Sequence, residues 1–489
     1  DRNGLRPCRY CVTEDDRLIM ASEAGALDVD PSRIVLKDRL QPGQMFLADA
    51  TTGRIRTDEE VFEDLVDDRY AMWLREERVA LRDLVVDAAP PTTNGTPAPD
   101  AASLQRTFGY TIEHLRRLLE PMAEDAKDPV GAMGDDTPSA VLSNRNQTLF
   151  SYFKQLFAQV SNPPLDYIRE DLVTSLTSHL GRQRNILGET PAHCRQLQLE
   201  SPILSEAEAA TLRALDRPGV RTCTLDITFP ADQSLAEAVS TLQQQAEHAV
   251  QDGCEIIVLT DHDTDADRLP IPSLLAVSAV HHHLIRRQLR TRTSLVLESG
   301  QPCTVHHMCT LLGYGVDAIC PYLAYTTLRE MADTARFEAP GDDAIRNYRS
   351  ALEDGILKVM AKMGISTLDS YKGAQVFEAV GLQSDFVDAY FRGTTSRIEG
   401  IGLDALEADL RERHRQAFDT DMTATLALDQ GGELYWRRDG EFHQWNPHTI
   451  ASLQRAVRTN DADAYHDFAE RINAQSEQLQ TLRGLLDFD

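Results

Sequence analysis

The 489-residue sequence contains no apolar run approaching the ~18–20 residues that span a bilayer, so we expect no membrane partner. It also lacks a signal peptide and a disulfide framework, because its eight cysteines are scattered along the chain. These absences predict a location in the reducing cytoplasm. Basic residues are few, 49 against 77 acidic ones, and the formal charge is −28. Such a field repels phosphate backbones, so we expect no nucleic-acid partner.

Common catalytic signatures are missing too. The sequence has no G-x-G-x-x-G after a strand, no P-loop and no G-x-S-x-G. Cys8 and Cys11 form a single C-x-x-C, but a zinc ribbon needs a second pair ~15–20 residues later, and the next cysteine is Cys194. The pair also falls on an expected strand, whereas redox pairs usually open a helix. We interpret it as coincidence.

The first part of the chain predicts β-structure over residues 1–57, with short apolar runs between turn formers. Thr57 is expected to cap a helical region that runs towards Leu84. Residues 87–102, DAAPPTTNGTPAPDAA, are rich in Pro, Thr and Ala and predict an exposed linker. Because the chain starts at Asp1 within a predicted strand and turn, we expect it to be a piece of a longer polypeptide.

From residue 222 onward, strand and helix patterns alternate, which favours a parallel sheet with right-handed crossovers. The fold class predicted for this region is therefore α/β. Residues 344–391 look helical, with Gly364 and Gly381 at positions typical of helix C-termini. After residue 420 we expect a hairpin and then a helix at 447–458. The expected strands of the alternating region are 222–229, 254–259, 293–299 and 317–322, and its expected helices are 234–251, 273–290 and 303–312.

The stretch CEIIVLTDHDTDADRLPIPS, residues 254–273, places acidic and imidazole groups where an α/β sheet binds ligands. LTDHDT resembles the strand-end motif of the polymerase and histidinol phosphatase family of metal phosphoesterases. The preceding strand, TLDITF, lacks that family's His-x-His, and Ala266 and Pro272 rule out a calcium loop. A solvated acidic loop is the simpler interpretation, and a metal site remains an alternative.

Two histidine clusters fall inside expected helices: His281, His282 and His283, and then His306 and His307. Consecutive helical residues point about 100° apart, so three in a row cannot ligate one ion. We expect packing or hydrogen-bonding roles for them.

Eight strings spread along the whole chain resemble, in order, the large subunit of glutamate synthase. Ordered matches over such a length are far more specific than any single motif. The strings are DRNGLRPCRYCVTEDDRLIMASEAGALD, RLQPGQMFLAD, GAMGDDTPSAVLS, YFKQLFAQVSNPPLDYIRE, PIPSLLAVSAVHHHLIR, LLGYGVDAICPYLA, KVMAKMGISTLDSYKGAQVFEAVGL and WRRDGEFHQWNP.

The resemblance implies a domain plan. Residues 1–86 would be the C-terminal portion of an N-terminal-nucleophile glutamine amidotransferase domain, β-rich, and 87–102 a linker. Residues 103–418 would be the central α/β domain, and 419–489 the start of the FMN-binding synthase domain, a β/α barrel. In this family ammonia from glutamine travels through an internal tunnel, adds to 2-oxoglutarate, and the imine is reduced to L-glutamate by FMN fed through an iron–sulfur cluster.

The family's nucleophilic cysteine, FMN strand and cluster cysteines match nothing in this chain, so we expect it to carry no catalytic, cofactor or metal residues. The resemblance implies a scaffold and an ammonia conduit, inactive alone. Its partners would be the remainder of its own polypeptide and either a small NADPH-oxidising subunit or ferredoxin. An interdomain spacer or interaction module is the alternative, and a metal-dependent phosphoesterase-like domain the third hypothesis.

The candidate conduit residues lie on two matched loops, GAMGDDTP (131–138) and QVSNPP (159–164). Interdomain turn chemistry is the alternative role for both. This chain departs from the family at Asp135 and Ser161, and again at Thr260 and His262. An extra carboxylate at Asp135 could protonate ammonia, so it should face away if the loop walls a conduit. The candidates are Gly131, Met133, Asp136, Thr137, Ser161 and Asn162.

The residues between these loops, 144–159, have a helical apolar pattern. One straight helix of ~16 residues would hold the loops about 24 Å apart. Contact between the loops therefore requires a break, which we predict at Asn144 to Gln147.

Overall fold

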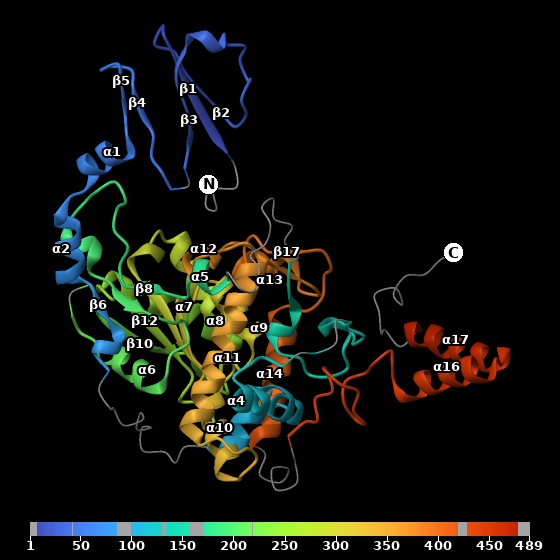
Figure 1. The fold of residues 1–489 in the computed structure, drawn as a ribbon. Helices are drawn as coiled ribbons and strands as arrows, with labels where there is room; N and C mark the ends of the chain where they lie inside the picture. Colours follow the sequence, from blue (N-terminus) through green and yellow to red (C-terminus); the bar gives the residue numbers. More distant parts are fainter. Residues whose placement is uncertain are drawn as a thin grey trace. The chain divides into compact units, whose positions relative to one another are not determined.

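The computed structural model describes residues 7–41, 43–85, 99–129, 131, 134–156, 170–217, 219–418 and 428–477. The chain divides into two compact units, Asp1–Glu76 and Glu77–Asp489, and each is described by itself (Figure 1). No described helix is long and apolar enough to cross a membrane.

The first unit is β-rich, as predicted. A cap joins its last strand to its first helix: the Thr57 hydroxyl accepts the N–H of Glu60 (3.3 Å), and the Glu60 carboxylate accepts the N–H of Thr57 (2.8 Å). This reciprocal pair confirms the predicted cap. The elements are β1 (Cys8–Thr13), β2 (Leu18–Ala21), η1 (Pro31–Arg33), β3 (Ile34–Leu40), β4 (Leu47–Asp49), β5 (Arg54–Arg56), α1 (Asp58–Leu65) and α2 (Asp68–Glu77). They form an antiparallel sheet of order β2-β1-β3 and a β4–β5 hairpin.

This unit has almost no core of its own. Among its described residues only Thr13 and Val61 are buried, whereas Leu27, Val35 and Leu65 each expose more than 60% of their surface. A sheet without a covering layer leaves its apolar face in water. The first unit therefore needs a partner layer to gain the stability of a complete domain.

The second unit is built on a parallel sheet whose strands occur in the order β10 (Thr222–Asp226), β12 (Ile256–Thr260), β14 (Ser294–Glu298), β15 (Ala318–Cys320). The crossovers are α7 (Leu235–Gln251), α8 (Ser273–Arg286) and α9 (Val305–Gly313). Since strand order follows chain order, right-handed crossovers place these helices on one face. The predicted α/β class and alternation are confirmed.

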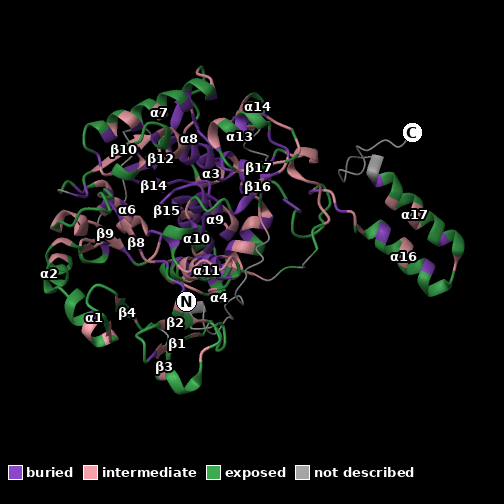
Figure 2. Ribbon diagram, turned by 90° about the horizontal axis from the view of Figure 1, so that it is seen from above, coloured by how far each residue is buried: buried purple, intermediate pink, exposed green. Residues whose placement is uncertain are grey.

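The core lies along β12, β14, β15 and α8, whose residues are mostly buried (Figure 2), whereas β10 is only partly buried. Fully buried strand residues such as Ile256, Leu259 and Leu297 each contribute about 1.5–3 kcal/mol relative to exposure. Strands buried on both faces carry near-continuous apolar runs, which is why the sequence signal here was strong.

The second unit contains further helices and strands. They are β6 (Val79–Ala80), η2 (Leu81–Asp83), α3 (Ala101–Thr107), η3 (His114–Leu119), α4 (Glu120–Asp125), η4 (Ala140–Leu142), η5 (Leu149–Tyr152), β7 (Phe153–Gln155), α5 (Glu170–Val173), β8 (Ser178–Leu180), η6 (Pro191–Cys194), β9 (Leu197–Leu199), α6 (Glu206–Arg213), β11 (Thr228–Pro230), β13 (Arg268–Pro270), η7 (Arg290–Arg292), α10 (Tyr322–Asp333), α11 (Gly341–Lys362), α12 (Leu368–Tyr371), β16 (Phe377–Ala379), α13 (Ser384–Tyr390), β17 (Thr395–Ser396), α14 (Leu403–Phe418), α16 (Pro447–Thr459) and α17 (Ala462–Glu477).

η3 is a π-helix, one residue per turn wider than an α-helix, and it runs directly into α4. Pro121 in the first turn of α4 has no N–H to donate, and its ring crowds the carbonyl of Arg117. The wider preceding turn relieves this conflict.

Two helical predictions were wrong in part. The helical region after Thr57 ends at Glu77, and Val79–Ala80 instead pairs with β9. Within 344–391, α11 is helical but Phe377–Ala379 forms β16. Gly381 (φ +84°) therefore follows a strand; a Cβ there would meet Val141 at 2.3 Å, so close packing selects this glycine.

Residues 144–156 are not helical, although their apolar spacing predicted a helix. Leu149 and Phe153 are buried as that pattern required, but they lie on a 3₁₀ turn and on β7, which pairs antiparallel with β16. Partners more than 200 residues away in sequence overrode the local pattern. No helix crosses residues 143–148, so Asn144 to Gln147 are not helical, but the helix that this break was to interrupt is absent too.

The segment 428–446 contains no described strand, so the predicted hairpin is wrong there. The helix predicted at 447–458 is confirmed as α16, which packs against α17. Figure 2 shows both helices as largely exposed. The predicted linker lies mostly outside the described residues, and its last two positions belong to α3.

Candidate functional site

The matched loop at 131–138 is shaped by its own side chains. The Asp135 carboxylate accepts the backbone N–H (3.1 Å) and the hydroxyl (2.6 Å) of Thr137, and lies 3.9 Å from the Lys154 ammonium. An aspartate that bonds two residues ahead makes a tight turn. Asp135 is 66% exposed, so its carboxylate is occupied by this turn rather than buried in a cavity.

A cavity of about 550 Å³ opens beside this loop. Its wall combines the loop, the 3₁₀ turn and strand at 149–155, the start of α9 and part of the segment 428–446. It is lined, among others, by Gly131, Gly134, Asp135, Asp136, Thr137, Phe150, Phe153, Lys154, His306, His307, Glu433, Glu441 and His443.

Asp136 attaches the loop to the segment 428–446. Its carboxylate lies 2.8 Å from His443 Nδ1 and accepts the N–H of Trp445 (2.8 Å), while its carbonyl accepts the N–H of Gln444 (3.1 Å). His443 Nε2 lies 2.6 Å from the carbonyl oxygen of Gly432. Both ring nitrogens of His443 therefore face oxygen atoms, one on the loop and one on its own segment.

Glu113 makes the second attachment. Its Oε2 accepts the backbone N–H groups of Gly432 (2.9 Å), Glu433 (2.7 Å) and Leu434 (3.1 Å), and its Oε1 accepts that of Tyr435 (3.0 Å). Successive N–H groups converging in this way form a nest for an anion. The nest holds a carboxylate that is only 5% exposed and that precedes it by more than 300 residues.

Two glycines allow this nest to form. Gly431 and Gly432 both have positive φ, +76° and +89°. A Cβ on Gly431 would meet Glu113 Cβ at 2.9 Å, and one on Gly432 would meet the Glu441 nitrogen at 2.9 Å. Conformation and space both require glycine there.

A second cavity, of about 450 Å³, adjoins the first. It extends along residues 106–111 and 144–148 to Gln301, Cys303 and Arg413. The two cavities share five lining residues: His114, Gln147, Ser151, His307 and Glu433. They are therefore neighbours separated by side chains, not by a layer of backbone.

Burial keeps three histidines on these walls, His114, His306 and His307, in the neutral form. Burial lowers the pKa of His114 and of His306, and it lowers the pKa of His307 well below the usual range. His307 is stacked on Phe150 (ring centroids 4.2 Å apart), and its Nδ1 accepts the N–H of Cys303 (3.2 Å). A neutral imidazole has no acidic proton to give to a base that passes it.

The carboxyl end of the sheet carries a buried polar network. Asp261 is fully buried, and it accepts bonds from the Ser299 hydroxyl, the N–H of Gly300 (3.0 Å) and the Tyr322 hydroxyl (2.8 Å). Burial raises its pKa to about 6. The predicted solvated loop is thus wrong for Asp261, because three donors replace the water it would otherwise need.

His262, one of the positions at which this chain departs from the family, contacts that network. Its Nε2 lies 3.0 Å from Glu298, which also pairs with Arg213, and its ring stacks on Tyr322 at 3.9 Å. Thr260 is the last residue of β12. These contacts make the stretch 254–273 a strand, a buried turn and a path into α8.

The other flagged residues have local partners. His281 accepts a bond from Arg290 (3.0 Å) and His283 lies 2.8 Å from Glu247, so these two histidines point to different partners. Burial lowers the pKa of His281 to about 3. Cys8 and Cys11 lie on β1, as expected.

Among the residues that the structure describes, no three His, Cys, Asp or Glu side chains are placed to hold a metal ion. An iron–sulfur cluster needs several converging cysteine thiolates. Here burial raises the pKa of the Cys303 and Cys309 thiols to about 12. The described residues do not fit a cluster site.

Of the predicted site residues, Gly131, Asp136 and Thr137 line the first cavity. Met133, Ser161 and Asn162 lie outside the described residues, so the predicted meeting of the two loops stays a prediction. The sequence analysis missed Glu113 and His443. The adjacent Gly431 and Gly432 were the available signal, because paired glycines often form nests.

Two protein-family models match this chain. The family model for the glutamate synthase central domain matches residues 103–383, more than half of the chain, and the model for class-II glutamine amidotransferases matches residues 1–73. The chain belongs to the glutamate synthase central-domain family. Both cavities border the matched central domain, and the first unit nearly coincides with the amidotransferase match.

Curated glutamate synthases align over the whole chain. The NADPH glutamate synthase large chain of Bacillus subtilis is 42% identical over 490 residues, and the NADH glutamate synthase of Schizosaccharomyces pombe is 42% identical over 508. Ferredoxin-dependent glutamate synthase 2 of Synechocystis is 38% identical over 516. All three cover 100% of this chain, which spans 32%, 24% and 32% of their respective lengths.

A solved flavocytochrome b2 mutant with benzoylformate also resembles part of this chain. Its TM-score is 0.24 at 13% identity, over 31% of this chain and 34% of that one. A likeness this slight carries no argument.

Proposed function

We propose that this chain is the middle part of a glutamate synthase, which makes L-glutamate from glutamine and 2-oxoglutarate, and that its two adjoining cavities are part of the path for ammonia. The chain itself acts as scaffold and conduit, and is inactive alone. Its partners in this proposal are the remainder of its polypeptide and an electron donor, either a small NADPH-oxidising subunit or ferredoxin. FMN and the iron–sulfur cluster would be held outside this chain.

The shared wall of the two cavities carries the proposal. Ammonia must stay neutral to add to a carbonyl, and a protonating wall would trap it as ammonium. His114 and His307 have a pKa lowered by burial, so they offer hydrogen bonds without an acidic proton. The Asp135 carboxylate is bonded to Thr137 and lies near Lys154, and this supports a wall that leaves ammonia neutral.

The domain plan remains part of this proposal: residues 1–86 from the amidotransferase domain, 103–418 as the central domain and 419–489 as the start of the synthase domain. The contacts of Glu113 and Asp136 support it, because they attach the segment 428–446 to the central domain at defined places.

Ser151 gives a direct test because it lines both cavities. In the full-length polypeptide that contains this chain, Ser151→Trp should leave glutamine hydrolysis in place, lower the glutamate formed per glutamine consumed, and release free ammonia. Ser370→Trp, at an exposed serine outside both cavities, is the matched control. Unchanged coupling in a folded Ser151→Trp enzyme would contradict the conduit.

A further inference from the structure

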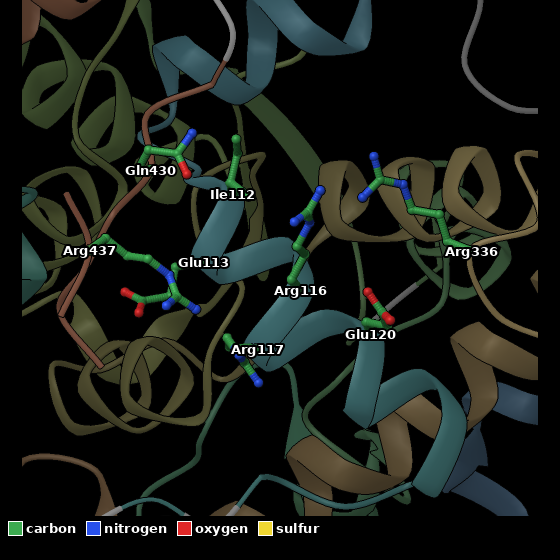
Figure 3. A pocket seen from close by; sticks show the side chains of 8 residues that line it. All are labelled: Ile112, Glu113, Arg116, Arg117, Glu120, Arg336, Gln430 and Arg437. Atoms are coloured by element: carbon green, nitrogen blue, oxygen red, sulfur yellow. The ribbon is translucent and has the colours of Figure 1, made fainter. Parts of the chain in front are cut away.

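A third cavity, of about 470 Å³, lies beside η3 and is lined mainly by charged side chains. Figure 3 shows that they come from three separate parts of the chain. Arg116 and Arg117 project from η3, Arg336 follows α10, and Arg437 reaches in from the segment 428–446. The full lining is Ile112, Glu113, Arg116, Arg117, Glu120, Arg336, Gln430 and Arg437.

The charge of this cavity is opposite to that of the chain. Four guanidinium groups, which stay protonated in proteins, face only two carboxylates. Glu113 already uses both oxygens on four backbone N–H groups. Among the described residues, no ion pair within 4.0 Å joins any of the four arginines to a carboxylate. In a chain of charge −28, such an unpaired group of cations needs an explanation.

One of the arginines is already oriented. The Arg117 guanidinium lies over the Tyr435 ring, 4.9 Å from its centroid. Arg437 and Arg336 enter from opposite sides in Figure 3. A planar guanidinium fork held in this way suits bidentate bonds to carboxylate or phosphate oxygens.

We propose that this cavity, the arginine pocket, binds a small anion with two or more negative charges, of the phosphate or dicarboxylate kind. Its volume lies within the ~300–1,000 Å³ typical of small-molecule sites. The anion bridges Arg437 on the segment 428–446 to Arg116, Arg117 and Arg336 on the central domain. Binding therefore stabilises the docked segment. The proposal does not depend on the conduit, since it needs only the geometry of these arginines.

Calorimetry on this chain at low salt tests the site, with pyrophosphate and glutarate as probes and acetate as the singly charged control. At least one dianionic or polyanionic probe should bind at submillimolar concentration, and acetate should not. Binding of pyrophosphate alone identifies a phosphate ligand, and binding of glutarate alone a dicarboxylate. Arg437→Gln and Arg116→Gln should each weaken binding about tenfold, because each removes charge-assisted bonds.

Arg438→Gln is the matched control, since Arg438 is the neighbouring exposed arginine that does not line the pocket. It should leave the affinity unchanged. The bound probe should also slow hydrogen exchange in residues 428–441 of the wild type but not of Arg437→Gln. Absence of binding by both probes, or equal weakening by Arg437→Gln and Arg438→Gln, overturns the proposal.

Discussion

Replacing Glu113 by alanine should release the segment 428–446 from the central domain. The substitution removes the acceptor of four backbone hydrogen bonds, from Gly432 to Tyr435. A hydrogen bond to a charged group contributes about 1.5–3 kcal/mol. The four bonds share one carboxylate, and residues 433–435 are exposed enough for water to replace it. We therefore expect the free energy that keeps the segment docked to fall by about 3–4 kcal/mol, less than the sum of four bonds.

Hydrogen exchange measures this loss directly, because each ~1.4 kcal/mol is a factor of ten in the opening equilibrium. Amides 432–435 should exchange about 100- to 1,000-fold faster in Glu113→Ala, while those of the sheet strands β12 and β14 stay unchanged. Glu113→Gln should recover only part of the protection, since its NH₂ group faces other donors.

Glu120→Ala is the matched control. Glu120 begins α4, close to Glu113 in sequence, but its carboxylate makes no hydrogen bond or ion pair among the described residues. It should leave exchange at 432–435 as in the wild type. Unchanged protection of these amides in Glu113→Ala would refute the reasoning that one carboxylate holds the segment.

Three further predictions follow from burial and contacts. Burial raises the pKa of Asp261 to about 6, above its ordinary value, so its contribution to stability is present below about pH 4 and is lost as pH rises through about 6. Thermal unfolding measured at several pH values should show a loss of about 2–3 kcal/mol in the free energy of unfolding of the wild type, but not of Asp261→Asn. If the two proteins show the same dependence of stability on pH, the prediction is wrong. In urea denaturation, Asp136→Asn should lower the free energy of unfolding by about 1–3 kcal/mol, because it weakens the bond to His443. Asp135→Asn is the control: its partners are Thr137 in its own loop and Lys154, so it should change the free energy of unfolding by less than about 0.5 kcal/mol. Limited proteolysis should cut within residues 7–76 before it cuts the central domain, because Thr13 and Val61 are the only buried residues among those described in the first unit. Equal resistance of both units to the protease would contradict this prediction.

The parallel sheet could be predicted from sequence because its signals are local. β12 and β14 are short apolar runs, α7 begins at a Ser234–Glu237 capping box, and Gly253 with φ +90° follows its end. Each of these acts within a few residues of chain. Local preference and tertiary burial agree in this region, so the pattern was sufficient.

The segment around β7 shows where such patterns fail. The apolar spacing correctly identified Leu149 and Phe153 as core, but apolar positions alone do not separate a helix from a turn and a short strand. Pairing of Phe153 with Ala379 decides the conformation, and nothing near residue 153 announces that partner. The resemblance to glutamate synthase identified the loop at 131–138 as a candidate, but it did not predict which residues the loop contacts.

The segment 428–446 explains why the central domain carries inward-facing carboxylates at all. It has no helix or strand to satisfy its backbone N–H groups, which must find other acceptors when they are buried. Glu113 and Asp136 supply these acceptors from the central domain, and Asp429, within the segment itself, accepts the N–H of Gly431 (2.7 Å). Glu113, Asp136 and His443 also line the first cavity, so the groups that dock the segment are the groups that close the cavity wall. In the proposed conduit, undocking the segment therefore opens the path to water, and attachment and enclosure are lost together.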